Sequence, residues 1–470
     1  MKKTNLVYVF TDQQSFDMLG CYGNQQIHTP HIDSFAEEGV RFANCFTTAP
    51  VCTPARGILL SGMHPLHNGA FANDTTMIPG KGTYFAQALS NAGYRTGYVG
   101  KWHLLGGERN RPVPKGELRY GFDEVFLTNN CHVDYRPNKC FYWNEDEEKT
   151  FFDEWEVYGQ TRQALKFLDQ QSSDQPFALF VSWHPPHDWG MTEEGYFRYQ
   201  TLPELQQLYE EQDVRLRAAV PDKSELRKQQ LRDYMAQCSG ADIAFGRIME
   251  KLKQKGMEEN TLVIFTSDHG DLLGAYDWQD SCKEYPQEYA THVPLIMRLP
   301  GRLQASTTSD LLVGTLDLMP TVLGLLGIET PESCQGINLA EAILSKDDSS
   351  VSSIPIMMMH SSIRQWRGVV TPEYLFAYQE GHVDRHPLCN VLYDRRNDPE
   401  QLHNHFDNPE YLMIRKQLMR LTSEWMARFD DPFVSYEQLV ESPINWKNES
   451  PEMINRVSPV EWIREIAKQI

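Results

Sequence analysis

Residues 6–11 read LVYVFT, and this apolar run ends at Asp12, which is followed by Gln13. Side chains that are apolar at successive positions, rather than alternately, are typical of a strand buried on both faces of a sheet. Further runs of this character alternate with helical patterns or turns at 95–100, 177–183, 262–267 and 294–299. Strands of this kind separated by helices predict an α/β fold with a large, mainly parallel sheet sandwiched by helices.

The clearest helix lies at 224–255, where apolar residues recur in steps of three and four: Leu231, Tyr234, Cys238, Ala241, Phe245, Ile248 and Leu252. We expect an N-terminal α/β domain over residues 1–345, because the polar stretch KDDSSVSS at 346–353 has the composition of a linker. Residues 354–470 predict a smaller C-terminal α+β subdomain. Its antiparallel sheet would come from IPIMMM, RGVVTPEYLFAYQE and NVLYDR, followed by a helix at 409–428 and a tail.

Composition narrows the classes of partner. A length of 470 residues, of which 41% are hydrophobic and 23% charged, indicates an ordinary globular protein. The net charge of −20 disfavours nucleic acid and anionic membranes, and an anionic substrate would need cationic groups gathered in its site. No apolar run approaches the length of a transmembrane helix, and the run near the start is too short for a signal peptide, so we expect a cytoplasmic location. If a leader precedes this sequence, the alternative is a periplasmic or secreted location.

The cysteines do not form a pattern typical of a disulfide scaffold. Nine cysteines occur without a CxxC pair, which also disfavours a structural zinc site. Apart from Cys52, we interpret them as structural or incidental: Cys21, Cys45, Cys131, Cys140, Cys238, Cys282, Cys334 and Cys389.

Polar side chains follow the predicted strands, at the point where each strand ends. They are Asp12, Gln13, Lys101, His103, His184, His187, Asp268 and His269. Because the carboxyl ends of the strands form the binding crevice of an open α/β sheet, we expect these groups to converge. Two carboxylates, an amide oxygen and an imidazole could hold one divalent cation, and oxygen-rich ligation favours calcium, magnesium or manganese over zinc. The alternative is that the acids merely cap helices.

A cysteine lies in the segment VCTPARGILLSG, residues 51–62. Thr53 and Pro54 predict a helix start, with a hydroxyl able to cap, and Gly62 predicts its end. Cys52 would then lie at the positive end of a short helix, with Arg56 one turn away. It could be a buried structural thiol, a nucleophile activated by the helix dipole and a histidine, or a precursor that is chemically converted. The residues alone leave these three interpretations open.

Cys52-Thr53-Pro54-Ala55-Arg56, continuing as GILLSG, resembles the signature of the formylglycine-dependent (type I) sulfatases, a family of the alkaline phosphatase-like superfamily. The resemblance continues in family order from residue 5 to about residue 405 through LVYVFTDQQSFDMLGCYGN, GKWHL, HPPHDW, TSDHGDLLG, Lys283, EYATHVPLIMRLPG and VLYDRRNDPEQLHN. It implies an alkaline phosphatase-like fold and a sulfuric ester hydrolase. It also implies that a formylglycine-generating maturation enzyme oxidises Cys52 to an aldehyde. One hydroxyl of the hydrated aldehyde would attack sulfur, and the other would drive release of sulfate.

The resemblance also implies a set of cation ligands. Asp12, Gln13, Asp268 and His269 would bind the cation together with the oxygen of the formylglycine formed from Cys52. Calcium is the cation expected first. Many sulfatases have aspartate where Gln13 stands and asparagine where His269 stands, and imidazole is a softer donor, so magnesium or manganese is an alternative. Phosphonate monoester hydrolases and phosphodiesterases of the superfamily look similar at these two positions, which makes that activity the alternative function.

Other residues acquire catalytic roles from the same resemblance. Arg56 would orient the diol, and His103 would take a proton from its second hydroxyl. Lys101 and Lys283 would bind sulfate oxygens and stabilise the charge that develops on them. The alternatives are solvated surface lysines and a hydrogen-bonded core histidine.

The substrate is predicted less directly. His187 resembles the histidine that lies near the leaving group, and His184 is the alternative for that role and a candidate substrate-binding residue. The aromatic segment NNCHVDYRPNKCFYWN at 129–144 contributes His132 and Arg136 as candidate substrate-binding residues, although it could equally be a packed loop. We favour a sulfated carbohydrate, either a small molecule or an oligosaccharide. An interpretation from another class is a metal-dependent binding protein in which Cys52 is never matured.

Overall fold

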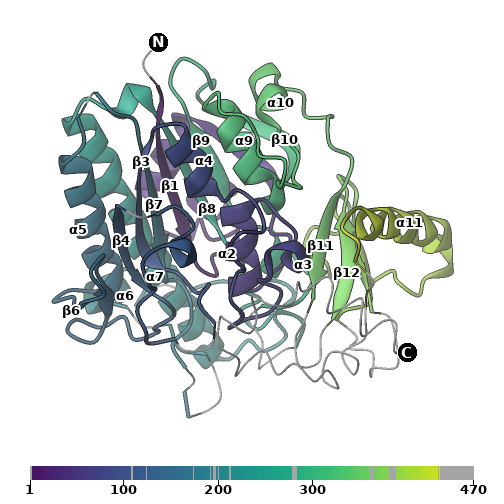
Figure 1. Ribbon diagram of the computed structural model, residues 1–470. Helices are drawn as coiled ribbons and strands as arrows, with labels where there is room; N and C mark the ends of the chain where they lie inside the picture. Colours follow the sequence, from purple (N-terminus) through teal and green to yellow (C-terminus); the bar gives the residue numbers. More distant parts are fainter. Residues whose placement is uncertain are drawn as a thin grey trace.

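The structure is a computed structural model that describes residues 3–431 and 433, apart from 107–108, 123, 173, 191, 194–196, 200, 211–212, 278–282, 360–364 and 380–387. A large sheet has helices on both sides, and a smaller sheet lies beside it next to α11 (Figure 1). Within these ranges every helix is too short or too polar to cross a membrane. Cys282 and the predicted tail lie outside the described residues, and every described cysteine is a free thiol.

The large sheet, as described, has ten strands in the order β10-β2-β9-β8-β1-β7-β3-β4-β5-β6. Their bounds are β1 (Asn5–Thr11), β2 (Val40–Phe46), β3 (Arg95–Lys101), β4 (Val125–Asn129), β5 (Phe141–Trp143), β6 (Lys149–Phe151), β7 (Phe177–Trp183), β8 (Thr261–Ser267), β9 (Leu295–Arg298) and β10 (Thr307–Gly314). The central strands β8, β1, β7, β3 and β4 are parallel, which confirms the predicted sheet. The strand β9 is antiparallel to both of its neighbours, as are β5 and β6 to theirs.

Helices cover both faces of this sheet (Figure 1). Their bounds are α1 (Pro30–Glu37), α2 (Cys52–Ser61), α3 (Pro65–Asn68), α4 (Phe85–Asn91), α5 (Glu156–Asp169), α6 (Pro203–Gln206), α7 (Glu225–Gln254), α8 (Glu288–Thr291), α9 (Leu318–Leu325) and α10 (Ala340–Ser345). Short 3₁₀ turns are η1 (Gly20–Tyr22), η2 (Glu117–Arg119), η3 (Glu258–Asn260), η4 (Ala275–Asp277), η5 (Thr315–Asp317) and η6 (Pro409–Tyr411). The helix α7 confirms the periodicity at 224–255, and the side chain of Ser224 caps its first turn.

Both faces of β1 are buried, as its composition predicts. Leu6, Tyr8 and Phe10 pack into the core that includes α2, α4 and α9. Val7 and Val9 point to the opposite face and pack into the core that includes α1, α5 and α7. The two-residue period of the strand therefore divides one apolar run between two cores.

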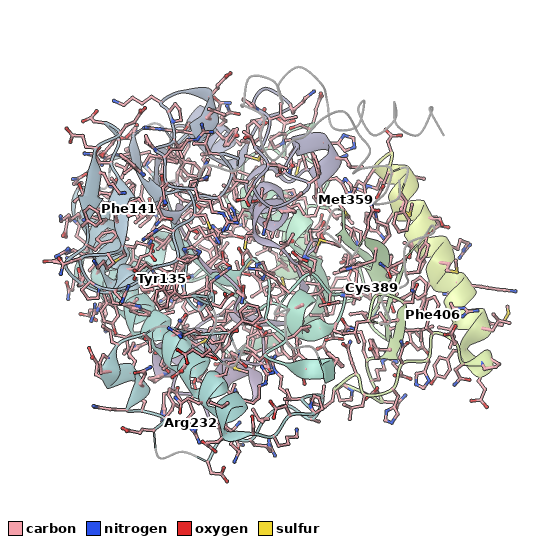
Figure 2. The ribbon with its side chains drawn as sticks, turned by 90° about the horizontal axis from the view of Figure 1, so that it is seen from below. Tyr135, Phe141, Arg232, Met359, Cys389 and Phe406 are labelled. Carbon is pink, nitrogen blue, oxygen red and sulfur yellow. The ribbon has the colours of Figure 1, made fainter. Side chains whose placement is uncertain are left out.

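The C-terminal sheet consists of β11 (Ile354–Met358), β12 (Trp366–Val370), β13 (Tyr374–Tyr378) and β14 (Val391–Asp394), followed by α11 (Leu412–Arg428). Its strands are antiparallel in chain order, as predicted. Seen from below, Phe406 lies beside α11, at the opposite end of the molecule from Phe141 on the outer strands of the large sheet (Figure 2). The Ser309 hydroxyl of β10 donates to Asp348 Oδ1 at 2.6 Å, so the predicted linker is tied to the large sheet. The domain bounds remain predictions.

An ion pair connects the C-terminal sheet to the large domain. Arg395, just after β14, donates from Nε to Glu288 Oε1 at 2.7 Å and from Nη2 to Asn44 Oδ1 at 2.8 Å. The other Glu288 oxygen lies 3.0 Å from His292 Nδ1. Burial alone would raise the pKa of Glu288, but the Arg395 guanidinium and His292 lower it to about 2. The carboxylate is therefore held ionised between two elements far apart in the sequence.

Replacing Glu288 with glutamine should lower the free energy of unfolding at pH 7 by about 3 kcal/mol. Because the folded-state pKa lies below the ordinary value of 4.5, the ionised carboxylate stabilises the fold above about pH 4.5, and this stabilisation is lost as the pH falls toward 2. Denaturant unfolding at pH 7 and pH 3 should therefore show a difference between wild type and Glu288→Gln that narrows in acid. Glu373→Gln is the control, because its pair with Arg396 at 2.8 Å is exposed and should contribute less than about 1 kcal/mol. Equal losses in the two variants would contradict the prediction.

Candidate active site

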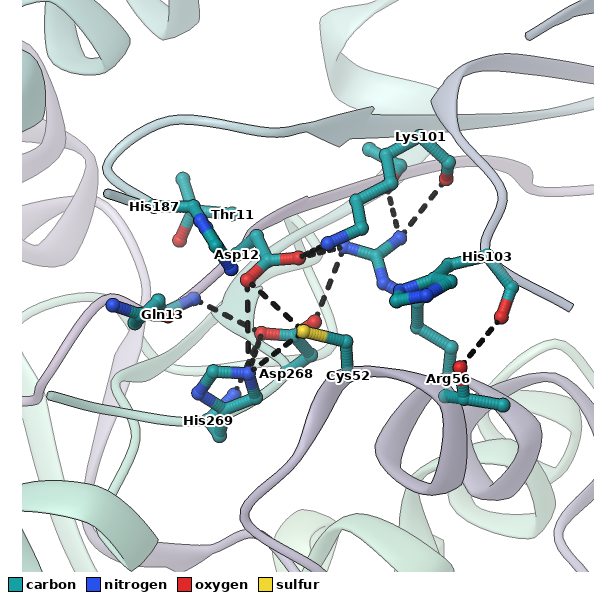
Figure 3. A network of polar contacts seen from close by, with 12 residues as sticks. Thr11, Asp12, Gln13, Cys52, Arg56, Lys101, His103, His187, Asp268 and His269 are labelled. Atoms are coloured by element: carbon teal, nitrogen blue, oxygen red, sulfur yellow. Dashed lines mark hydrogen bonds and ion pairs between the residues drawn. The ribbon is translucent and has the colours of Figure 1, made fainter. Parts of the chain in front are cut away.

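The carboxyl ends of the central strands bring the predicted polar groups together. Thr11, the last residue of β1, is in register with Trp183 of β7 and Ser267 of β8. Asp12, Lys101, His187, Asp268 and His269 therefore lie at one edge of the sheet, joined by Cys52 and Arg56 from α2 (Figure 3). The structure thus shows the convergence that the strand ends predict.

Cys52 is the first residue of α2 and points into this cluster (Figure 3). The helix ends where predicted, because Gly62 takes a left-handed conformation with φ 62° and donates to the carbonyl of Ile58. The predicted cap is wrong: Thr53 already lies inside the first turn, and its hydroxyl donates to the carbonyl of His103 at 2.9 Å. The side chain of Thr53 therefore ties the nucleophile position to the segment after β3.

Four potential ligand groups surround one point in the buried cluster. Cys52 Sγ lies 3.3 Å from His269 Nε2 and 3.7 Å from Asp12 Oδ1. His269 Nε2 lies 3.6 Å from Asp12 Oδ1 and 3.7 Å from Asp268 Oδ1. The ligand atoms of these residues all lie within 4.8 Å of one another, and all four side chains are buried. The spacing is that of a set able to hold one metal ion.

The chemistry of these groups fits a divalent cation. Asp268 Oδ2 is buried and its partner is the guanidinium of Arg56, with Nη2 at 3.1 Å, while burial and the neighbouring charge of Asp12 raise the pKa of Asp268. Two close, buried carboxylates are stabilised by a bound cation. His269 Nδ1 lies 2.9 Å from the carbonyl of Gly270, which fixes the proton on Nδ1 and leaves the lone pair of Nε2 facing the cluster. His269 is therefore oriented as a metal ligand would be.

Gln13 is held at the side of this cluster. Its backbone has φ 72°, and its N–H donates to Asp268 Oδ1 at 3.0 Å. The side-chain amide donates to Asp271 Oδ2 at 2.8 Å and to Asp188 Oδ1 at 3.3 Å, while its oxygen accepts from Lys283 Nζ at 2.7 Å. The prediction that Gln13 binds the cation stays a prediction. Asp188 and Asp271 orient this amide. The sequence did not predict that role, because both residues are far from Gln13 in the sequence and meet it only in the folded chain.

Cations neutralise the buried carboxylates. Arg56 Nη2 lies 3.0 Å from Asp12 Oδ2 and 3.1 Å from Asp268 Oδ2. Its Nη1 donates to the carbonyl of Lys101 at 2.9 Å, and the Lys101 ammonium donates to Asp12 Oδ2. Both side chains are completely buried. The alternative that Lys101 is a solvated surface lysine is therefore excluded.

Lys283 and His187 approach Cys52 from another side. Lys283 Nζ lies 2.7 Å from His187 Nε2 and 3.4 Å from Cys52 Sγ. His187 Nδ1 donates to the carbonyl of Asp188 at 2.7 Å, so its Nε2 accepts from the lysine. His184 lies behind, with its ring centroid 5.2 Å from that of His187, and neither of its ring nitrogens has a hydrogen-bond partner among the described residues. The geometry thus favours His187 over His184.

Positive charge around residue 52 favours an anionic group there. Burial would raise the pKa of the Cys52 thiol, but Lys101, Lys283 and His269 together lower it well below its usual value. The ammonium groups of Lys101 and Lys283 would also attract the oxygens of an anionic ester. A chain with a net charge of −20 thus concentrates positive charge at one buried point.

His103 lies beside Cys52 in a left-handed conformation with φ 57°. Its Nε2 lies 3.0 Å from Asp74 Oδ1. Burial lowers the pKa of His103, but Cys131 and the hydrogen bond to Asp74 outweigh this and raise it to about 10. The contact with Asp74 thus favours the protonated imidazole, and acting as a base requires the loss of that proton first. Sequence reasoning missed Asp74, since an aspartate in a loop resembles an ordinary turn residue.

The candidate substrate residues lie farther out. The ring of His132 packs on Phe141 at 4.6 Å between centroids. Arg136 pairs with Asp134 at 2.7 Å and lies over the ring of Trp189 at 5.0 Å. Among the described residues, neither His132 nor Arg136 makes a hydrogen bond or ion pair with the Cys52 cluster. Their substrate-binding roles remain predictions.

A mixed sheet with a parallel centre, two buried carboxylates and a nucleophile position surrounded by cations define a hydrolase of anionic esters with the alkaline phosphatase-like fold. A family model described as "Sulfatase" matches residues 4–328, and one described as "N-sulphoglucosamine sulphohydrolase, C-terminal" matches residues 274–427. The chain belongs to the sulfatase family, and it is a sulfatase enzyme. This excludes the interpretation as a binding protein without catalytic activity.

Individual relatives are similar over most of the chain. An "Ulvan-active sulfatase" of Formosa agariphila is 31% identical, over 92% of this chain and 83% of the relative. An "Endo-4-O-sulfatase" of Bacteroides thetaiotaomicron is 28% identical, over 91% of this chain and 93% of the relative. A solved structure from Bacteroides fragilis, described as a sulfatase of the yidJ type, superimposes with a TM-score of 0.82 at 28% identity and covers 93% of this chain and 98% of that one.

Proposed function

We propose that this protein removes sulfate from a sulfated carbohydrate, using a formylglycine formed from Cys52 and one divalent cation. The observation that carries the proposal is the placement of Cys52 Sγ, 3.3 Å from His269 Nε2, 3.7 Å from Asp12 Oδ1 and 3.4 Å from Lys283 Nζ. A residue at this position faces potential cation ligands on one side and an ammonium on the other. The names of the relatives, which refer to ulvan and to an endo-acting 4-O-sulfatase, support a carbohydrate substrate.

Asp12, Asp268 and His269 would hold the cation together with residue 52, and Gln13 is the further candidate ligand. When bound, the cation would supply Lewis acidity that polarises a sulfate oxygen and lowers the pKa of a neighbouring hydroxyl. Calcium remains the first candidate, with magnesium or manganese as alternatives because an imidazole replaces an oxygen donor.

The chain's own residues would bind and orient the ester. Lys101 and Lys283 supply ammonium groups for sulfate oxygens, and Arg56 fixes the acids that face residue 52. His187, held through its Nδ1 by the carbonyl of Asp188, faces the side from which Lys283 approaches. His103 has Nε2 on Asp74, which leaves Nδ1 to exchange a proton with a reacting group.

Maturation would have to precede folding. Every residue of α2 is buried, from Cys52 to Ser61. A maturation enzyme that recognises the CTPAR segment could not reach the thiol in the folded protein. The partner enzyme would therefore act on the unfolded or emerging chain.

The matured protein should hydrolyse p-nitrophenyl sulfate with a kcat/KM at least about 100-fold above that for bis-p-nitrophenyl phosphate. A sulfate monoester has three terminal oxygens for the cation and the two lysines, whereas a diester must place a second substituent among them. Steady-state rates on one preparation, with residue 52 verified by mass spectrometry, test this. A preference for the diester would favour the alternative, a phosphonate monoester hydrolase or phosphodiesterase.

A further inference from the structure

A polar connection runs from the buried His103 to the protein surface. Asp74 Oδ1 lies 3.0 Å from His103 Nε2 and accepts from Arg109 Nε at 2.9 Å. Asp74 Oδ2 accepts from Arg109 Nη2 at 2.8 Å. Side-chain exposure increases along this path, from 2% for His103 to 22% for Asp74 and 46% for Arg109. The path thus links the catalytic cluster to a guanidinium that solvent reaches.

Asp74 is fixed relative to residue 52. Its backbone N–H donates to the Thr53 hydroxyl at 3.3 Å, and Asn73 Oδ1 accepts from the Thr53 N–H at 3.0 Å. Asp74 has φ 63°, a left-handed conformation that aspartate tolerates better than most residues but that still needs support from its surroundings. These contacts hold the carboxylate in a defined place beside the first turn of α2.

Arg109 is held in place but retains donors for a ligand. A guanidinium has five N–H groups, and Asp74 takes the Nε and Nη2 edge. The carbonyl of Arg109 accepts from the Cys131 N–H at 3.2 Å, so the main chain is held as well. For the N–H groups of Nη1, no acceptor is found among the described residues. The exposed end of a planar fork that is already oriented is suited to an oxyanion.

We propose that Arg109 binds a second anionic group of the substrate, a carboxylate or a further sulfate on the same saccharide, and that Asp74 is a positioning residue for His103. The proposal rests on the proposed function. Because the chain carries a net charge of −20, a doubly anionic saccharide is repelled at long range and needs local cations for each of its charges. Lys101 and Lys283 serve the ester itself, and Arg109 serves the neighbouring anion.

Three matched substrates separate the possible anions. The first is a monosulfated disaccharide that carries a uronate carboxylate, the second has that carboxylate reduced to an alcohol, and the third is the reduced form with an added sulfate. Variants Arg109→Ala, Arg109→Lys and Asp74→Asn would be assayed on matured protein. Arg162→Ala is the matched control, because Arg162 is also 46% exposed and pairs with an acid, Asp153, at 2.7 Å. A second readout is calorimetric binding of each disaccharide in a Cys52→Ala background with the cation present.

For Arg109→Ala we expect kcat/KM on the carboxylate or the doubly sulfated substrate to fall by about 10- to 100-fold, mainly through KM. On the reduced substrate kcat/KM should fall by at most about threefold, so the variant should no longer prefer substrates with a second anion. The charged substrate that loses more identifies the anion. Arg109→Lys should restore part of the binding, and Arg162→Ala should match wild type. Equal losses on all three substrates, or no loss on any, would overturn the role of Arg109.

Asp74→Asn should behave differently, since a positioning residue affects every substrate. We expect kcat to fall by about 10- to 100-fold on all three substrates, which is the usual range for loss of an orienting partner. Because Asp74 also holds Arg109, KM should rise on the two charged substrates and stay nearly unchanged on the reduced one. A loss confined to KM on the charged substrates would overturn the positioning role. If wild type turns over neither these substrates nor p-nitrophenyl sulfate, the proposed function fails. Calorimetry then still tests the role of Arg109. Tighter binding of the charged disaccharides than of the reduced one, lost in Arg109→Ala, would support that role.

Discussion

Replacing Cys52 with alanine should reduce sulfate ester hydrolysis by about 10⁴-fold or more while the fold stays intact. The side chain at this position lies within 3.7 Å of Asp12 Oδ1, His269 Nε2 and Lys283 Nζ, so its removal leaves these groups without a nucleophile. Hydrolysis of p-nitrophenyl sulfate, measured together with the melting temperature, separates loss of chemistry from loss of structure.

The matched control is Cys45→Ala, because Cys45 is also completely buried but lies on β2. We expect that variant to keep its activity and to lose only a small amount of stability. Mass spectrometry of the peptide with residue 52 completes the test, since formylglycine differs from cysteine by exchange of sulfur for oxygen and loss of two hydrogens. Substantial activity in Cys52→Ala, or an active wild type that carries only a thiol, would contradict the proposed chemistry.

The central strands could be predicted because their burial on both faces leaves a strong signal. Val7 and Val9 pack on one side and Leu6, Tyr8 and Phe10 on the other, so no polar residue interrupts the run. The apolar pattern of a strand does not show whether the strand runs parallel or antiparallel to its neighbours. The sequence therefore predicted the position of β9 but not its antiparallel pairing. The short strands β5 and β6 lie at the outer edge of the sheet, and the fully exposed pattern of β6 gives no hydrophobic signal.

In the site, residues at strand ends could be predicted from the sequence, whereas a residue placed by a loop could not. Asp12 and Asp268 could be expected to meet, because each directly follows a buried parallel strand. Asp74 could not, since its contact with His103 depends on a loop pinned to α2 through Thr53. Sequence patterns identified the groups at strand ends, whereas the residues that orient those groups depend on loop conformation.

Replacing Asp268 with asparagine should remove most of the stabilisation that a divalent cation gives to the fold. A cation at 100 times its Kd stabilises the wild type by about 2.7 kcal/mol, and a 100-fold weaker Kd leaves only about 0.4 kcal/mol at the same concentration. Without cation the substitution should no longer destabilise the fold. Burial and the charge of Asp12 raise the pKa of Asp268, so the ionised carboxylate of the wild type is itself unfavourable at pH 7. In chelator the variant should therefore melt at or above the wild type, although kcat on p-nitrophenyl sulfate falls by about 10³-fold or more.

Thermal melts in chelator and in added calcium, magnesium or manganese measure the change in stability of the variant relative to wild type without and with cation. Calorimetry gives the Kd of each cation. Asp242→Asn is the matched control, because Asp242 is also completely buried and burial raises its pKa to about 7, but it accepts from the N–H groups of His31 and Ile32 at the start of α1. Its effect on stability should be the same with and without cation. A full cation-dependent shift in Asp268→Asn would show that the ion binds elsewhere, and the gathering of Asp12, Asp268 and His269 around Cys52 Sγ would then need another explanation.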